Sequence, residues 1–589
     1  MKNNKNIKSI ILALALVAFT AQSCSDFLDE KLVSDVSAGS YYTTAAGLED
    51  AVDATYSFLR EIHSNERAYM LTIFGTDTHT NGADGGYKSF NFYDNGLNPT
   101  VNILDQQWTF LYQGINQANA VLNRSKDVKD MSDALKTQRQ AEARFLRAYY
   151  YFYLVQTWGD VYLTLEETIG AEVEADPSPQ SAVYADGIIP DLEFTFANLP
   201  DAQSDYGRAT KGAAQFLLAK AYLTRGQQSF GSPADFASAN TLFSNVINDH
   251  GYALVESHDA LWDQDNQINS EIIWAVQYAT DLILNGGNGG VGNRGHLYFL
   301  MEYDIRAGMI RDIEGGRPFK RFRPTDYMGT VWAETRDIDA RYDQTYKHAY
   351  ISNNPKSIPK WEQVHVTNGA KKADGSTVTA SDIGTDRFTV GDTAMYVPGP
   401  GKDAEWMTGK KFQVRYNVIT QNPAFDGDQY FYTERLFPTL KKFIDPRRPT
   451  IQWERGSRDW FVMRLADAYL LRAEARFLAG NSAGAADDIN VVRTRAAKEG
   501  MEAAMQITAA DVDIDFILKE RALEMDGEQC RWFDLARTGK LVEYVRAYNP
   551  LGAGNIQDYH TKRPIPQTQI DRTVGGYPQN CGYPGSDCN

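Results

Sequence analysis

The stretch DWFVMRLADAYLLRAEARFLAGNSAGAADDINVVRTRAA, Asp459–Ala497, decides the fold class. It predicts two helices joined by a turn at Gly480, because apolar residues recur every three or four positions on both sides. Ser482 is the expected N-cap of the second helix. The inward positions are Met463, Ala466, Leu470, Ala473 and Phe477, then Ala485, Ile489, Val492 and Ala496. A pair this short cannot bury its apolar face alone, so it must stack on neighbouring helices.

Two other parts of the chain show the same alanine-rich helical pattern. They are Thr137–Trp158, and Ala209–Thr224 followed by Asp235–Ile247. Their irregular spacing differs from the fixed period of a tandem repeat array. Further helices are expected at Ala45–Ile62, Val101–Leu122, Ala182–Asn198 and Ile514–Ala536. The fold class is therefore mainly α, with tetratricopeptide-like helix pairs and a large loop-rich insertion.

Four regions follow from these patterns. Residues 1–23 form a signal peptide, 24–250 an N-terminal helical region, 251–458 a loop-rich insertion with ligand-binding loops, and 459–589 a C-terminal helical region and tail. Within the insertion, Glu271–Tyr278 predicts a short strand. The N-terminal region also contains a long loop, Phe74–Thr100, and a loop of this length is usually functional or disordered. Its aromatic residues argue against disorder.

The N-terminus is a targeting segment. Three lysines precede the apolar run Ile10–Phe19, which is too short to span a bilayer. Cys24 follows small residues, as in a lipobox, so we expect cleavage before Cys24 and its acylation. An ordinary signal peptide with an incidental cysteine is the alternative. The protein is then exported and held on a membrane by lipid rather than spanning it.

The net charge of the chain limits the classes of partner that the protein is expected to bind. Removing a signal peptide with three lysines and no acidic residue changes the formal net charge from −17 to −20. This charge argues against nucleic acid and anionic membranes as partners, although a local basic pocket would still accept an anion. Cys581 and Cys588 lie close together in the tail, where a local disulfide is a hypothesis that the sequence leaves open.

The catalytic and cofactor motifs all have simpler interpretations. Gly480–Gly484 matches G-x-S-x-G, but a helix precedes it where a nucleophile elbow needs a strand. Gly287–Gly292 matches G-x-G-x-x-G without a βαβ unit around it. The histidines form no zinc motif, and the acidic loops lack EF-hand spacing. We therefore expect no catalytic residues, no cofactor and no metal site.

What remains is a set of aromatic loops on a rigid frame. Tyr and Trp rings stack on the apolar face of a sugar, while Asn, Asp and Arg reach its hydroxyl groups. Packing under the loop is the alternative for each single ring. For the set as a whole, the pattern favours ligand binding.

At this point the chain resembles the SusD/RagB family of nutrient-binding outer-membrane lipoproteins. The resemblance runs nearly from end to end and depends on the following motifs: CSDFLD (Cys24–Asp29), AEARFLRAYYYFYLVQTWGD (Ala141–Asp160), LLAKAYLTRG (Leu217–Gly226), LADAYLLRAEARFLAG (Leu465–Gly480), INVVRTRA (Ile489–Ala496), ILKERALEMDGEQCRWFDLARTGKL (Ile517–Leu541) and RPIPQTQI (Arg563–Ile570). Tyr162 and Cys581 stand where the family usually has proline, and the second departure favours a disulfide particular to this protein.

The resemblance implies a cell-surface lipoprotein of the outer membrane that binds glycans and is not an enzyme. It would capture oligosaccharides and deliver them to a SusC-like TonB-dependent transporter, with its helical side towards the transporter. The alternative within the family is a peptide-binding, RagB-like protein that serves an oligopeptide transporter. A hydrolase is a third hypothesis, and turnover of a bound glycan would establish it.

The family places ligand contacts on the loop after the first helix and on the loop-rich middle. These correspond here to Asp77–Tyr93 and about Arg294–Trp332. From side-chain chemistry within these segments, the expected ligand-binding residues are Asp77, Asn81, Tyr87, Phe92, Tyr93, Arg294, Tyr298 and Trp332.

Overall fold

The computed structural model describes residues 41–588 apart from 280, 282, 368, 371, 373–375, 398 and 401–432. The predicted signal peptide and Cys24 lie outside the described residues. The main helices are α3 (Ala45–Ser57), α7 (Asn102–Arg124), α8 (Asp133–Trp158), α10 (Ile189–Asn198), α11 (Lys211–Gly226), α12 (Pro233–Asp249), α19 (Leu465–Leu478), α20 (Ser482–Ala496) and α21 (Ile514–Glu524). None of the described helices has the length and apolar character needed to cross a membrane.

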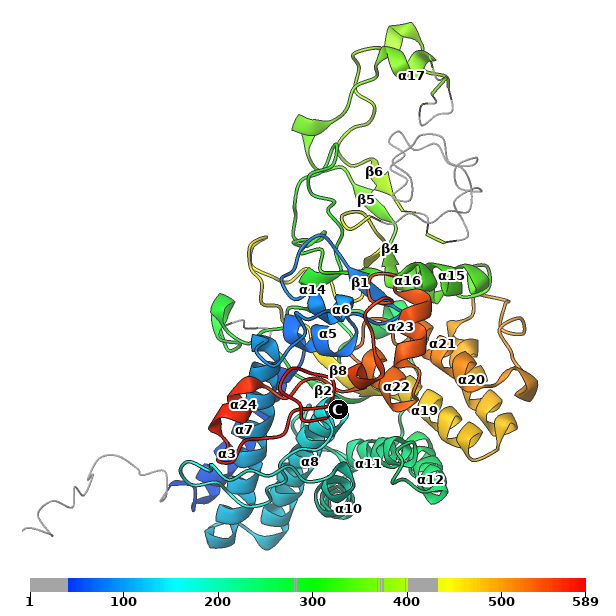
Figure 1. Ribbon diagram of the computed structural model, residues 1–589. Coiled ribbons are helices and arrows are strands. Elements are labelled where there is room, and N and C mark those ends of the chain that lie inside the picture. The colour runs from blue at the N-terminus through cyan, green and yellow to red at the C-terminus, as the bar shows by residue number, and fades with distance from the viewer. Residues whose placement is uncertain are drawn as a thin grey trace, which may run out of the picture.

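These helices pack in a continuous row. Each contacts the next in the order α3, α7, α8, α10, α11, α12, α19 and α20, so the C-terminal pair stacks on the N-terminal pairs across more than 200 residues of sequence. The row occupies the lower part of Figure 1. Close approach of α11 and α12 needs Gly226, because a Cβ there would lie 2.7 Å from the Phe236 ring. The predicted mainly α architecture with stacked helix pairs is therefore confirmed.

Shorter elements connect and cover the row. The short helices are α4 (Leu59–Ile62), α5 (Glu66–Thr72), α6 (Ser89–Phe92), α9 (Gln180–Ala182), α13 (His258–Leu261), α14 (Gly295–Tyr298), α15 (Asp326–Thr335), α16 (Arg341–Thr345), α17 (Gln363–Thr367), α22 (Arg531–Arg537), α23 (Leu541–Tyr548) and α24 (Gln567–Arg572). The strands are β1 (His79–Asn81), β2 (Ile272–Val276), β3 (Phe322–Pro324), β4 (Tyr346–Lys347), β5 (Ala349–Ile351), β6 (Thr393–Tyr396), β7 (Thr439–Leu440) and β8 (Trp460–Arg464). They form four antiparallel pairs, β1–β3, β2–β8, β4–β7 and β5–β6.

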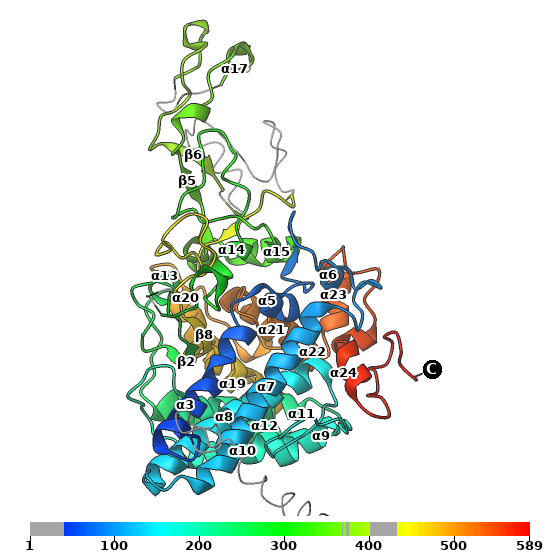
Figure 2. The same ribbon diagram turned by 90° about the vertical axis from the view of Figure 1, so that its left-hand side faces the viewer.

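The described residues form four hydrophobic cores. Two small ones lie among the main helices, and the other two divide the molecule. The larger core contains residues from Leu59 to Tyr583 and unites the helical row with the base of the insertion. The smaller core lies in the insertion and includes Tyr303, Tyr350, Phe388 and Phe437. It belongs to a projection with β5, β6 and α17 that extends away from the helices (Figure 1, Figure 2). The domain boundaries at 250 and 458 stay predictions, because the larger core crosses both.

The structure corrects the start of the stretch from Asp459 to Ala497. Trp460–Arg464 is strand β8, and the first helix begins at Leu465. A short run of apolar residues fits both helical and strand periods, and the aromatic and β-branched residues here favour the strand. The N-cap of α20 is Asn481, whose side chain accepts a hydrogen bond from the Gly484 amide, and Ser482 is the first helical residue.

Two other predicted elements also differ. Ile514–Ala536 is broken into α21 and α22, with Gly527 and Gln529 between them at positive φ of 77° and 57°. A residue at positive φ cannot continue a right-handed helix. The loop from Phe74 to Thr100 contains strand β1 and the short helix α6. The loop thus contains regular structure, in agreement with the expectation from its aromatic residues.

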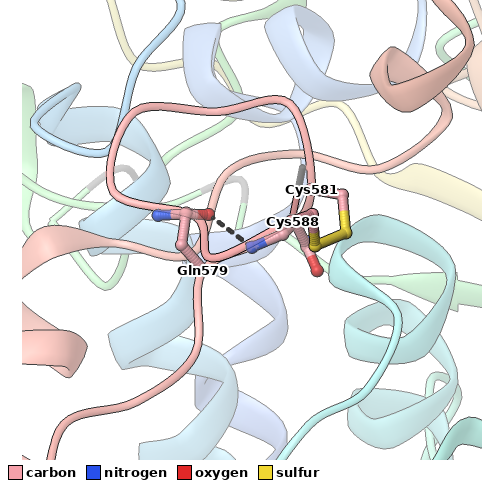
Figure 3. The surroundings of a disulfide bond; sticks show 4 residues. Gln579, Cys581 and Cys588 are labelled. Carbon is pink, nitrogen blue, oxygen red and sulfur yellow. Dashed lines mark hydrogen bonds between the residues drawn. A yellow bond between two sulfur atoms is a disulfide. The ribbon is translucent and has the colours of Figure 1, made fainter.

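The C-terminal tail is closed by the disulfide between Cys581 and Cys588, whose Cα atoms lie 5.4 Å apart (Figure 3). The structure confirms this hypothesis. The tail is fixed to the helical body beside the disulfide, where the Asn580 side chain donates hydrogen bonds to the carbonyl groups of Trp158 and Arg563, each at 2.8 Å. The side chain of Gln579 accepts from the Asn580 amide at 2.8 Å (Figure 3).

Candidate ligand-binding face

The two segments chosen from the sequence lie side by side. Strand β1 pairs with β3 so that Asn81 stands opposite Phe322, 241 residues further along the chain. Backbone hydrogen bonds continue this contact from Gly82 to Arg321 at 2.9 Å and from Asp84 to Lys320 at 3.2 Å. A Cβ at position 82 would lie 2.0 Å from the Lys320 carbonyl oxygen, so glycine is required there. The loop after the first helices and the loop-rich middle therefore build one surface, beside α5, α6 and α14 (Figure 1).

Five of the predicted ligand-binding residues are buried. Asp77, Asn81, Tyr93, Tyr298 and Trp332 are each at most 2% exposed. Asp77 forms an ion pair with Arg531, whose Nε lies 2.9 Å from Oδ1. The Tyr93 hydroxyl donates to the Gly75 carbonyl at 2.9 Å. A ligand on the surface cannot reach these side chains in this conformation, and we do not include them in the proposed site.

Their rings belong to aromatic packing. Tyr298 meets Tyr69 edge-on at 5.5 Å between ring centroids, and Trp332 meets Tyr342 at 5.6 Å. The excess of aromatic residues in the composition thus serves the core at these positions. Tyr87, Phe92 and Arg294 are partly exposed, and their contact with a ligand stays a prediction.

The accessible part of the surface is organised around Phe319, which is half-buried. Three guanidinium groups surround its ring and form what we call the arginine cluster, namely Arg294, Arg317 and Arg321. Their Cζ atoms lie 5.9, 5.0 and 5.2 Å from the ring centroid, within the range of cation–π attraction. Backbone hydrogen bonds from Phe319 to Leu297 and from Arg321 to Tyr298, both 2.9 Å, hold the segment against α14.

Two carboxylates form ion pairs with the arginine cluster. Glu454 lies 2.7 Å from both Arg294 and Arg317, and Glu66 lies 2.9 Å from Arg321. Arg455 lies near the cluster, since the charge of Arg294, after burial, lowers the pKa of Arg455. A neutral cluster would need as many carboxylates as arginines. The balance at this position is positive.

A short basic run in the sequence indicates this cluster, although the negative net charge of the whole chain conceals it. Arg317–Arg323 reads RPFKRFR, with four basic residues and no acidic residue among seven. Counting charge in short windows would have found it in a chain whose net charge is −17. Arg294 was the only member of the cluster predicted as a ligand residue.

Two acidic residues of this face, Glu302 and Asp84, are engaged in ion pairs. Glu302 contacts Arg306 at 2.9 Å and Lys320 at 3.4 Å, and Asp84 contacts Lys320 at 3.2 Å. Among the described residues no group of three or more His, Cys, Asp and Glu side chains could hold a metal ion. The geometry suits binding by hydrogen bonds, ring stacking and charge.

A groove of about 490 Å³ beside α7 also contains aromatic residues, including Trp108, Tyr112 and Tyr162. Two of its polar groups are already used within the protein. The Trp108 indole donates to Gln569 at 3.1 Å, and the Tyr112 hydroxyl donates to the Tyr162 carbonyl at 2.9 Å. Trp108 is only 4% exposed. We therefore favour the surface around Phe319 over this groove.

Comparison with known proteins supports the family resemblance seen in the sequence. Residues 270–583 match the SusD family, and residues 26–223 match a family described as starch-binding and associating with the outer membrane. A SusD-like protein of Formosa agariphila is 23% identical over 97% of this chain and 99% of its own length. The starch-binding protein SusD of Bacteroides thetaiotaomicron is 24% identical over 81% of this chain and 78% of its own length.

Solved structures agree in fold. A laminarin-binding SusD-like protein superposes with a TM-score of 0.64 at 24% identity, covering 92% of this chain and all of its own. An identity this low establishes the fold and leaves the ligand open. Because the family match spans more than half of the sequence, the chain belongs to the SusD/RagB family.

Proposed function

We propose that this protein is a non-catalytic lipoprotein of the outer-membrane surface that binds oligosaccharides and delivers them to a SusC-like TonB-dependent transporter. The observation that carries the proposal is the joining of residues 77–93 and 294–332 into one surface with partly exposed rings. Tyr87, Phe92 and Phe319 offer apolar area for a sugar ring, and the neighbouring arginines offer hydrogen-bond donors. Relatives named for starch and laminarin binding support the same class of ligand.

Anchoring and delivery complete the proposal. Acylation of Cys24 would hold the protein at the membrane, and the sequence around Cys24 supports it. The row of helices is the surface we assign to the transporter. Replacing Cys24 with Ala should move the protein from the membrane fraction to the soluble fraction. Retention of this variant in the membrane would contradict the anchor.

Calorimetry of the mature protein against neutral and acidic polysaccharides tests the binding function. Phe319→Ala and Tyr87→Ala should each lower the affinity for the glycan about tenfold, because each variant loses one aromatic stacking contact. Phe230→Ala is a matched control, because Phe230 is 37% exposed and lies in the helical body after α11. Full affinity in both test variants would contradict the site, and co-purified peptides without any glycan binding would favour the peptide alternative.

A further inference from the structure

The charge around Phe319 is unusual for this chain. The whole sequence has 59 basic and 76 acidic residues, yet RPFKRFR at Arg317–Arg323 carries four positive charges. The fold brings Arg294, which follows the Gly287–Gly292 segment, next to Arg317 and Arg321 of this run. Sequence-distant arginines are therefore gathered at one half-buried ring in a protein that is otherwise acidic.

Arg464, a buried arginine of the core, has more carboxylates around it than any member of the arginine cluster. Arg464 contacts Glu271, Glu524 and Glu528 at 3.0, 2.7 and 2.8 Å and is 1% exposed. In the arginine cluster, by contrast, Glu454 is shared by two arginines. The side chains of Arg294, Arg317 and Arg321 are 19%, 30% and 20% exposed, so water and solutes reach them.

Guanidinium groups with spare donors have a preferred ligand chemistry. Arginine presents five N–H groups in a planar fork that matches the two oxygens of a carboxylate or sulfate. Hydrogen bonds between two charged groups are about twice as strong as those between neutral groups. The hydroxyl groups of a neutral sugar do not require such an excess of positive charge.

We propose that the arginine cluster binds an acidic sugar unit, whose carboxylate or sulfate lies among Arg294, Arg317 and Arg321 beside the Phe319 ring. This inference rests on the proposed glycan-binding function and specifies its ligand class. The ring supplies apolar contact to the sugar, and the arginines select units that carry negative charge.

The test uses a matched pair of probes, polygalacturonate and its methyl ester, with chondroitin sulfate as the sulfated probe and laminarin as a neutral reference. The wild-type protein should bind polygalacturonate or chondroitin sulfate at least about tenfold more tightly than the neutral probes. That preference should fall when salt is raised from about 0.05 M to about 0.5 M, because the cluster is partly exposed. Stronger binding of polygalacturonate would identify the carboxylate as sufficient, whereas chondroitin sulfate presents carboxylate and sulfate together.

Variants separate the arginines from general folding effects. Arg317→Gln should reduce affinity for the acidic probe about tenfold and leave the methyl ester unchanged. Arg124→Gln is the matched control, because Arg124 is also about 30% exposed, pairs with Glu167 and lies 5.2 Å from the Tyr42 ring on another part of the surface. Arg321→Gln repeats the test at a second position, and melting temperatures verify that both variants fold.

The outcomes distinguish the inference from the function beneath it. Equal binding of polygalacturonate and its methyl ester, with no response to salt or to Arg317→Gln, would overturn the acidic-ligand inference while glycan binding stands. Binding of laminarin alone would do the same. Absence of binding to all four probes and to a wider glycan panel would overturn both proposals.

Discussion

Arg464 in strand β8 and Arg317 on the candidate face both carry a guanidinium group, but the first is buried and the second is partly exposed. Arg464 is 1% exposed and has three carboxylates around it, whereas the Arg317 side chain is 30% exposed and shares one. A buried charge must keep its partners, because an unpaired charge in the interior is very costly. A half-exposed charge can exchange a partner for water or a ligand at little cost. The comparison teaches that exposure, rather than residue type, separates structural arginines from candidate binding arginines.

The largest effect is expected at the buried site. Arg464→Ala leaves Glu271, Glu524 and Glu528 with one cation fewer in the interior and should destabilise the protein by about 5 kcal/mol. Urea unfolding measures this, with Arg317→Ala as the comparison, which should cost less than about 1 kcal/mol. Similar losses in the two variants would break the distinction.

Trp332→Ala tests the same distinction for aromatic residues. Trp332 is 1% exposed, so its truncation should cost about 4 kcal/mol through lost burial and the remaining cavity. Tyr87 is partly exposed, and Tyr87→Ala should cost about 1 kcal/mol while weakening glycan binding. Thermal unfolding and calorimetry on both variants give the two readouts. A Trp332→Ala protein with unchanged stability and lost binding would place that ring in the site after all.

Asp459 gives the third effect, in the pH dependence of stability. Burial raises the pKa of this carboxyl group to about 6 in the folded protein, above the usual value of about 3.9 in an unfolded chain. Its stabilising contribution is complete below about pH 4 and is lost as the pH rises through 6, because the folded state binds the proton more tightly. Asp459→Asn should therefore match the wild type near pH 4 and be more stable by up to about 3 kcal/mol at pH 7. Parallel stability curves for the two proteins between pH 4 and 7 would contradict the shift.

Sequence patterns predicted the helical row well because long amphipathic helices repeat one signal many times. They misplaced the start of the stretch at Asp459 because WFVMR is apolar on both faces and its strand character depends on pairing with β2. They missed the break before α22, where Gln529 adopts φ of 57° for reasons that local sequence does not contain.

For the candidate site, family resemblance gave two segments that the structure places side by side, while side-chain chemistry alone did not indicate which residues are exposed. Asp77 and Trp332 have the residue types of a sugar site, yet tertiary contacts bury them. Phe319 and Arg317 were overlooked, although the basic run around them is visible in the sequence. Burial depends on which distant segments meet, and one sequence does not state this.

The smallest effect concerns the tail. In the chain-entropy account, a disulfide that joins residues seven positions apart stabilises the fold by about 2 kcal/mol. Replacing both Cys581 and Cys588 with Ser should therefore lower the melting temperature while leaving glycan affinity unchanged, because the tail lies on the helical body (Figure 3). A loss of affinity in this variant would show that the tail and the candidate face are coupled.

The pairing of β1 with β3 and of β2 with β8 also sets an order of events in folding. Asn81 must find Phe322, and Val276 must find Trp460, so each contact closes a loop of more than 180 residues. Closing such loops slows folding, since chain entropy is lost before the contact is gained. During synthesis, helices α3 to α12 can form early. The surface around Phe319 can form only after the middle of the chain has been made, and strand β8 in the core beneath it is complete only once Arg464 has been added. A chain that stops before Arg464 would therefore contain every residue of the arginine cluster and lack the full β2–β8 pair in the core beneath it.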